Sequence, residues 1–300
     1  ADLLVVLRSS KPSTPRENAM TKPPADAAGR RAASSAAAPF AGLLAGVGQV
    51  LAEQPLDTLK TRLQSAHFGA SDGAFRLTVT TVRGEGGGAL LLGVVPRIAT
   101  YPLVKLSLFS LFETFYAQTQ SFALAGACAG ALNTVVSCPA DVVKSQLQVQ
   151  RRKDPSLAAV RVVSSLVKMH GAGVLYRGLA PLAARDTLGY AILYTVYYRG
   201  QELQRRSDAA AAAPRWAIGG AAGACFYGAT LPIDRVKVLQ QTQAGGAALG
   251  LGECLATVRR GGLAAFYRGA GPTFARTFVG QAVGLSVYDL VRGWQPTYCD

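Results

Sequence analysis

One ten-residue segment occurs three times in this chain, at residues 55–64, 139–148 and 232–241. Each copy begins with a proline and holds an aspartate two residues, a lysine five residues and a glutamine nine residues later. A helix that carries this segment kinks at the proline, and residues three, four and seven apart share one helical face. Each copy therefore presents an acid, a base and an amide on one side of a helix. Such an internal repeat predicts three equivalent structural units.

The three charged faces follow long uncharged stretches, at residues 36–52, 114–140 and 216–233. On a solvated helix an acid and a lysine three residues apart would simply pair and contribute at most about 0.5 kcal/mol. Three copies in register, each after a membrane-length apolar stretch, favour charges that lie at the ends of membrane-spanning helices. Charges in that environment need partners.

The composition supports a membrane protein. Half of the residues are hydrophobic and 16% are charged, and the apolar stretches are rich in glycine and alanine. This pattern indicates several spanning helices that line a wet interior. The net charge of +14 fits contact with nucleic acid, with anionic lipid or with anionic solutes. Several bases lie inside or at the ends of apolar helical stretches, which disfavours nucleic acid and leaves lipid and solute open. These bases are Arg97, Lys105, Arg185 and Arg276.

No group of residues in the sequence indicates a metal site, a cofactor site or an enzyme active site. The five cysteines form no CxxC pair, and the two histidines, His67 and His170, are far apart in the sequence. The glycine cluster at residues 84–88 lacks the ending of a phosphate-binding loop. Without a nucleophile, base or metal constellation, we expect a protein that is not an enzyme and has no cofactor.

The repeats also set the domain organisation. Residues 1–37 mix serine, proline, alanine and basic residues without periodicity, which predicts a disordered extension, with a mitochondrial targeting segment as the alternative. Each repeat holds a glycine-rich helix, the ten-residue segment, a short amphipathic segment and a second long helix that opens at a glycine. Six spanning helices follow, with both termini on one side. The three repeats are residues 38–120, 121–210 and 211–300.

The three copies resemble the hallmark of the mitochondrial carrier family (solute carrier family 25), a threefold Pro-x-Asp/Glu-x-x-Lys/Arg motif. The resemblance covers about residues 38 to 295. It implies an all-α membrane protein with six transmembrane helices in a pseudo-threefold, barrel-like bundle and three short matrix helices. It also implies one transport domain, multi-pass in the mitochondrial inner membrane, that moves a small solute by alternating access. A carrier-like membrane adaptor that does not transport is the alternative of another class.

By that resemblance, the repeated charges form a gate on the matrix side. Each aspartate pairs with the lysine of another repeat, and a glutamine braces each pair. Opposite charges at a water-filled constriction attract each other yet separate when solvent enters. The implied pairs are Asp57 with Lys144, Asp141 with Lys237 and Asp234 with Lys60, and the bracing residues are Gln64, Gln148 and Gln241.

The family's second gate, an [FY][DE]xx[KR] motif on the cytosolic side, is complete only at residues 288–292, where Asp289 and Arg292 supply the charges. In the first repeat Glu113 supplies an acid, but Tyr116 stands where a base is expected. The second repeat has Tyr197, Tyr198 and Gln201 at these places. We therefore expect a closure that is weaker in charge, which leaves strict antiport in doubt.

Two helix starts resemble the family's cardiolipin-binding sites, where backbone amides and the helix dipole face a phosphate. They are Arg177-Gly178 and Arg268-Gly269, whereas the first repeat has Leu92-Gly93. The resemblance thus implies cardiolipin as a lipid partner, with the motif complete at two of three helix starts, and a monomeric carrier.

The expected solute site lies seven and eight residues beyond each helix-opening glycine. An ionised side chain at this depth faces the interior, because facing lipid costs several kcal/mol. Arginine grips a carboxylate with two parallel hydrogen bonds, and an aspartate supplies the opposite charge. The site residues are Thr100, Tyr101, Arg185, Asp186, Arg276 and Thr277, with Lys105 one helical turn beyond Tyr101.

An Arg-Asp pair in the second repeat with an arginine in the third resembles carriers of amino acids, carnitine esters and S-adenosylmethionine. We therefore expect an amino-acid-like zwitterion as the solute, and a carboxylate or another metabolite is the alternative. The structural alternative is that Arg185 and Asp186 only neutralise each other. Lys105 and Glu53 depart from the pattern of these carriers, and the sequence assigns neither of them a role.

Overall fold

The computed structural model describes residues 25–65, 73–149, 158–206, 215–243 and 250–292. The chain divides into two compact units, residues 1–39 and residues 40–300, and the account below concerns the second unit. Most of the extension expected at residues 1–37 lies outside the described part. A helix begins at Ala25, however, within a run of alanines that favour helix.

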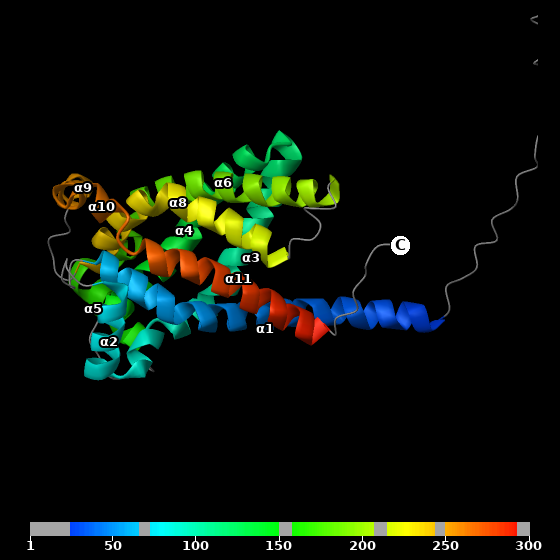
Figure 1. Ribbon diagram of the computed structural model, residues 1–300, viewed down its shortest axis with the longest axis horizontal. Coiled ribbons are helices and arrows are strands. Elements are labelled where there is room, and N and C mark those ends of the chain that lie inside the picture. Colours follow the sequence, from blue (N-terminus) through cyan, green and yellow to red (C-terminus); the bar gives the residue numbers. More distant parts are fainter. Residues whose placement is uncertain (1–24, 66–72, 150–157, 207–214, 244–249, 293–300) are drawn as a thin grey trace, which may run out of the picture. The chain divides into compact units, whose positions relative to one another are not determined.

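Twelve helical segments are described, in an order that repeats three times: a long helix, a short helix, a tight helical turn and a second long helix. No strand occurs in the described ranges. The short segments gather at one end of the long helices (Figure 1). The long helices are α1 (Ala25–Gln64), α3 (Val94–Thr119), α4 (Phe122–Val149), α6 (Leu179–Arg206), α8 (Arg215–Thr242) and α11 (Ala270–Arg292). The short segments are α2 (Ala74–Glu85), η1 (Gly87–Leu91), α5 (Ala158–His170), η2 (Ala172–Tyr176), α9 (Leu251–Arg260) and α10 (Gly262–Phe266).

Three glycines before α3, α6 and α11 connect each repeat to the next. Gly93, Gly178 and Gly269 have φ angles of +82°, +79° and +87°, a region that side chains disfavour. A Cβ built at each glycine would lie 3.1 to 3.3 Å from an atom of a ten-residue segment in another repeat. The first glycine faces the second repeat, the second faces the third, and the third faces the first. This cyclic order closes the three repeats into a ring.

Glycines within the first helix of the second and third repeats allow close helix packing. Cβ atoms at Gly126 and Gly130 of α4 would overlap the backbone of Tyr190 and Asp186 on α6. A Cβ at Gly223 of α8 would overlap the Thr277 side chain on α11. These contacts bring the backbone at Asp186 directly against α4 and fix its depth in the bundle.

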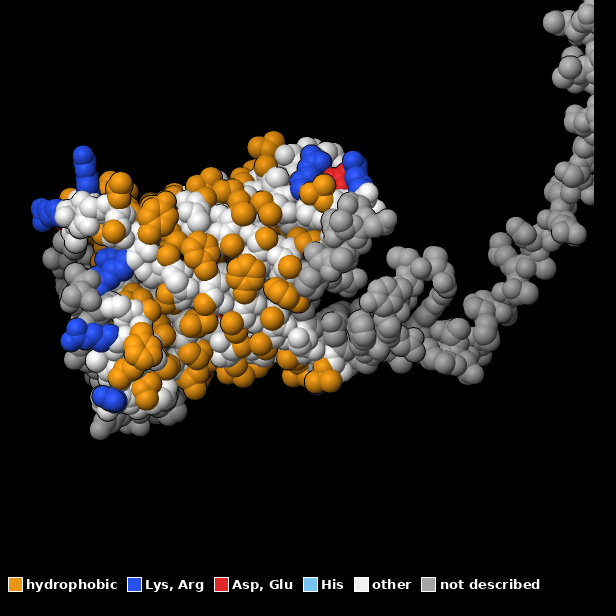
Figure 2. Space-filling model, in the orientation of Figure 1, with side chains coloured by type: hydrophobic (Ala, Val, Ile, Leu, Met, Phe, Trp, Pro, Cys, Tyr) orange, Lys and Arg blue, Asp and Glu red, His pale blue; other side chains and the backbone are white. Residues whose placement is uncertain are grey.

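Hydrophobic side chains cover the visible face of the helices, and lysines and arginines gather at the two ends (Figure 2). Leu103, Leu106 and Phe109 of α3 and Leu132 and Val135 of α4 are each at least half exposed. Within the described residues two stretches are long and apolar enough to cross a membrane, Gly87–Thr119 and Phe122–Val149. Ionised residues lower the hydropathy of α6. Arg185 and Asp186 in its middle are largely buried, whereas Arg199, Glu202 and Arg206 near its end are exposed.

Candidate solute site and gate

Three ion pairs join the ten-residue segments of different repeats, with nitrogen–oxygen distances of 2.5 to 2.6 Å. Each pair connects one repeat with the next, in the same cyclic order as the helix-opening glycines. The resemblance implied these partners, and all three pairs are formed. They are Lys144 with Asp57, Lys237 with Asp141 and Lys60 with Asp234.

The three pairs differ in burial. The side chains of Asp57 and Asp234 are 3% and 1% exposed, whereas that of Asp141 is 27% exposed. The two buried aspartates also accept bonds from arginines, as described below. Buried charges need such additional partners, because the free-energy cost of desolvating an ion exceeds the attraction of a single ion-pair partner. Asp141, being partly solvated, needs fewer.

The glutamines occupy three different arrangements. Gln148 Nε2 donates a hydrogen bond of 2.9 Å to Asp57 Oδ2 and so braces that pair. Gln64 donates instead to a backbone carbonyl of the third repeat, and Gln241 accepts from a hydroxyl group of α4. Of these three glutamines, Gln148 is the one whose hydrogen bond within the described residues reaches a charged member of the expected gate. The other two glutamines link neighbouring repeats.

The arginines of the expected solute site bind the acids of the gate. Arg276 Nη1 lies 3.0 Å from Asp57 Oδ1. Arg185 Nη1 lies 3.0 Å from Asp234 Oδ1, and its Nη2 lies 2.6 Å from Asp186 Oδ1. The solute residues and the gate are therefore one connected network of charges.

Three further residues belong to this network, although the sequence did not place them in the site. Arg97 Nη2 lies 2.5 Å from Glu53 Oε2, and the Arg97 guanidinium is also 3.8 Å from Asp57. Arg276 donates to the hydroxyl group of Tyr227. The signal was spacing: Glu53 precedes Asp57 by four residues, and Tyr227 precedes the next gate aspartate by seven. Spacing of this kind places a residue on the gate's face of its helix.

The remaining expected solute residues are held by close neighbours. Tyr101 donates a hydrogen bond of 3.1 Å to Gln49 Oε1 on α1, and Lys105 Nζ lies 5.5 Å from the centre of the Tyr101 ring. The hydroxyl groups of Thr100 and Thr277 donate to carbonyls of their own helices. Tyr101 thus connects α3 with the α1 face that carries the gate.

An aromatic stack lies where the cytosolic gate is expected. Phe112 stacks on Tyr194 with ring centres 3.9 Å apart, and Phe122 stacks on Tyr198 at 4.6 Å and on Tyr116 at 4.8 Å. Tyr116 and Tyr198, which replace a base and an acid of the gate motif, therefore share one stack that joins α3, α4 and α6. Glu113 beside it is exposed. The side chains of Asp289 and Arg292 lie outside the described residues.

The expected lipid sites have glycines in the required conformation, at Gly178 and Gly269. Arg177 Nη1 lies 3.4 Å from the carbonyl of Gln243 in the third repeat and donates to it. Arg268 precedes the second glycine, and its own carbonyl accepts a hydrogen bond from Gln64. These helix starts are therefore also contacts between repeats.

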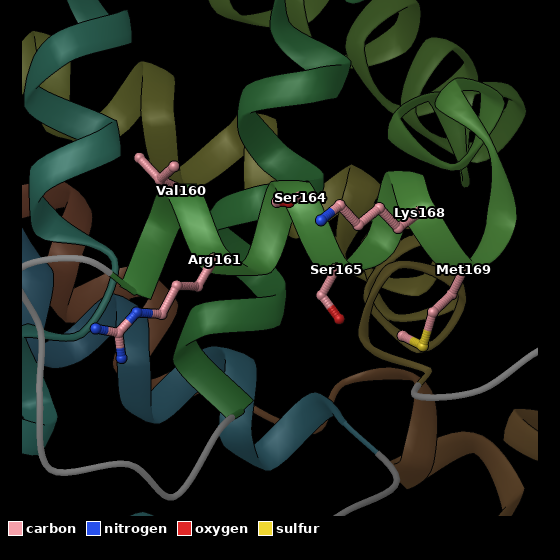
Figure 3. Close-up of a pocket in the computed structure, with 6 residues that line it drawn as sticks. All are labelled: Val160, Arg161, Ser164, Ser165, Lys168 and Met169. Atoms are coloured by element: carbon pink, nitrogen blue, oxygen red, sulfur yellow. The ribbon is translucent and has the colours of Figure 1, made fainter.

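A pocket of about 490 Å³ lies apart from these residues, on the outer face of α5 (Figure 3). Its lining residues come from this one helix. Arg161, Ser164, Ser165 and Lys168 are exposed and share a helical face, while Val162 and Leu166 pack into the core on the opposite face. No residue of the expected solute site lines it. The lining residues are Val160, Arg161, Ser164, Ser165, Lys168 and Met169.

Comparison with known proteins agrees with this architecture. The family model described as mitochondrial carrier protein matches residues 31–123, 116–208 and 209–298. The mitochondrial arginine transporter BAC2 of Arabidopsis thaliana is 27% identical, over 83% of this chain and 88% of the relative. The probable chloroplastic S-adenosylmethionine carrier 2 of Arabidopsis thaliana is 30% identical, over 84% and 72%. The mitochondrial citrate transporter C of Aspergillus niger is 30% identical, over 88% and 92%.

The three family-model matches confirm the prediction of an all-α membrane protein with three repeats and of a protein that is not an enzyme. The named relatives transport different solutes, so they support transport of a small molecule without selecting one solute class. The chain belongs to the mitochondrial carrier family and is a multi-pass transporter of the mitochondrial inner membrane.

Proposed function

We propose that this carrier moves an amino-acid-like zwitterion by alternating access, a class that includes amino acids, carnitine and its esters and S-adenosylmethionine. One observation carries the proposal: Asp186, eight residues beyond Gly178, and Arg276, seven residues beyond Gly269, present opposite charges at neighbouring depths in α6 and α11, and both are buried. A zwitterion brings one charge for each. Relatives named as an arginine transporter and an S-adenosylmethionine carrier support the same class.

In this proposal Arg276 and Arg185 hold the carboxylate of the solute, and Asp186 holds its cationic group. Guanidinium groups bind carboxylates through paired hydrogen bonds, and a buried aspartate favours an ammonium or sulfonium group. Thr100 and Tyr101 line the same level on α3, with Lys105 one helical turn further along. The Asp186 carboxylate already binds Arg185, so the solute's cation competes with a guanidinium for it.

A second candidate is a carboxylate without a cationic group. The observation that favours it is a third guanidinium, that of Arg97, beside Glu53 and Asp57. Relatives named as a succinate/fumarate transporter and a citrate transporter support this candidate.

The three ion pairs between repeats serve as the matrix gate in our proposal, with the three glutamines as links across it. Closure of the cytosolic side relies on Glu113, Asp289 and Arg292, with the aromatic stack in place of the missing charges. We further propose that repeats 38–120, 121–210 and 211–300 act as one monomeric transport domain. Cardiolipin binds at the helix starts of Arg177-Gly178 and Arg268-Gly269.

Uptake into liposomes by the purified carrier tests whether the protein transports at all. A panel of labelled zwitterions and carboxylates separates a transporter from a carrier-like adaptor, because an adaptor carries none of them. Efflux measured with and without external solute then distinguishes antiport from uniport.

The Asp186→Asn variant tests the zwitterion assignment. It keeps the shape of the side chain but removes the charge, so binding of a cationic group should weaken by about 1.5 to 3 kcal/mol. This corresponds to roughly a tenfold to hundredfold loss of affinity. Competition by zwitterions and by dicarboxylates against a transported tracer measures it. The affinity for dicarboxylates, which have no cationic group, should change little.

A matched control is Glu202→Gln, the same change of acid to amide on α6 but at an exposed position that pairs with Arg199 and Arg206. This variant should compete as the unchanged protein does. Equal weakening of both solute classes by Asp186→Asn would mean that Asp186 only positions Arg185, and the zwitterion assignment would fall.

A further inference from the structure

The guanidinium groups of the network differ in how their charge is balanced. Arg185 is held by Asp186 at 2.6 Å and by Asp234 at 3.0 Å. Arg97 and Arg276 instead share the same two acids. Glu53 lies 2.5 Å from Arg97 and 3.6 Å from Arg276. The other acid is Asp57, which the Lys144 ammonium also contacts.

The network therefore divides into two groups of unequal charge. In the first group, the bases Arg97, Arg276 and Lys144 from α3, α11 and α4 face the acids Glu53 and Asp57 of α1. In the second group the bases and acids are equal in number. That second group consists of Lys60, Arg185 and Lys237 with Asp141, Asp186 and Asp234. Among the described residues of the network, one positive charge is left without a counter-charge, and it belongs to the first group. A buried charge without a counter-charge is costly, and an entering anion relieves that cost.

The Glu53 carboxylate occupies the place that a bound anion would take. Its Oε2 atom faces both Arg97 and Arg276, and its Oε1 atom accepts a hydrogen bond of 2.8 Å from Gln49. Gln49 in turn accepts from Tyr101, one of the expected solute residues. A carboxylate bridging two guanidinium groups is the arrangement expected of a bound solute carboxylate.

Gly280 on α11 makes room for this carboxylate. A Cβ built there would overlap the Oε1, Cδ and Cγ atoms of Glu53. Any other residue at position 280 would push Glu53 away from the arginines. The position of Glu53 thus depends on a helix far from it in the sequence, and it is 6% exposed.

We propose that Arg97, in place of Arg185, joins Arg276 to form the site for the solute's carboxylate, and that Glu53 is the internal counter-ion that the carboxylate displaces. The proposal rests on the proposed function only in requiring a solute with a carboxylate, and it holds for zwitterions and dicarboxylates alike. Glu53 then sets the affinity: it keeps the two guanidinium groups in place when the site is empty and competes with the solute when it fills.

Two substitutions in the purified full-length carrier test this proposal, because they should change the affinity for carboxylates in opposite directions. Glu53→Gln removes the competing charge, so carboxylate affinity should rise about threefold to tenfold. Arg97→Gln removes one of the two guanidinium groups, so carboxylate affinity should fall at least tenfold, and Arg97→Lys should restore part of it. The readouts are the midpoint of thermal unfolding against ligand concentration and competition for uptake. The probe pairs are succinate with succinamide and L-arginine with L-argininamide.

The amide of each probe pair lacks the carboxylate and serves as the matched control. Arg97→Gln should lower the affinity for the acids and leave the affinity for the amides unchanged. An equal loss of affinity for both would overturn the proposal. Gly280→Ala provides an independent test, because it crowds Glu53 without removing its charge and should also raise carboxylate affinity. Lower carboxylate affinity in both Glu53→Gln and Gly280→Ala would also overturn the proposal.

The unfolding readout does not require transport. If the unchanged carrier moves no member of the panel, the proposed function fails. The opposite shifts of Glu53→Gln and Arg97→Gln in the unfolding assay then still decide the carboxylate site by themselves.

Discussion

Replacing Lys144 with alanine separates the role of a gate residue from its contribution to stability. Lys144 Nζ lies 2.5 Å from Asp57 Oδ2, which is buried. An orphaned buried charge costs about 3 to 5 kcal/mol. Asp57 keeps Arg276 at 3.0 Å and the amide of Gln148 at 2.9 Å, however. We therefore expect the free energy of unfolding to fall by only about 1.5 to 3 kcal/mol, the contribution of one hydrogen bond to a charged group.

Transport by Lys144→Ala should nevertheless be lost. The pair is the direct charge contact between the gate segments of the first and second repeats, and a carrier has to close to complete its cycle. Two measurements on the same preparation check this: thermal unfolding in detergent and solute uptake in liposomes. Lys168→Ala, the same change at an exposed position on α5, is the control and should leave both measurements unaltered.

The result that would refute the reasoning is a Lys144→Ala carrier that reconstitutes and transports at the original rate. In that case the ion pair is structural and the gate assignment is wrong. A loss of stability as large as that of an orphaned charge would instead show that Arg276 and Gln148 do not compensate Asp57.

Two further predictions concern the framework of the site. Gly178→Ala should lower the free energy of unfolding by about 1 to 2 kcal/mol, because φ is +79° there and the new Cβ would lie 3.1 Å from Gln241. Gly173→Ala is the control and should have little effect, because a Cβ there meets no neighbouring atom. Thermal unfolding of both variants checks this, and equal midpoints would contradict it. Phe112→Leu should cost about 1 kcal/mol through lost stacking on Tyr194, whereas Phe109→Leu, which is 53% exposed, should be nearly neutral. A double-mutant cycle with Tyr194→Leu measures the stacking directly, and a coupling energy near zero would argue against it.

Much of the fold could be predicted from the sequence because its signals are local. The prolines of the ten-residue segments, the helix-opening glycines and the apolar stretches fix the order and number of the long helices. The short amphipathic segment expected in each repeat is a helix in the structure, α2, α5 and α9 in turn. The cyclic pairing of the repeated aspartates and lysines was implied by the resemblance to the carrier family, and the structure contains all three pairs.

Only the tertiary structure decided which partners the site residues share. Spacing along one helix tells which face carries Glu53, Arg97 or Arg276, but it does not tell which neighbouring helix that face meets. That Arg276 of the proposed solute site binds Asp57 of the proposed gate, and that Gly280 leaves room for Glu53, depends on contacts between α1 and α11. The aromatic stack also depends on tertiary contacts. Tyr116 and Tyr198 stand where the motif has a base and an acid, and only the packing of α3, α4 and α6 brings their rings together. Helix formation is a local property of the sequence, whereas the balance of buried charges depends on side chains from helices that are far apart in the chain.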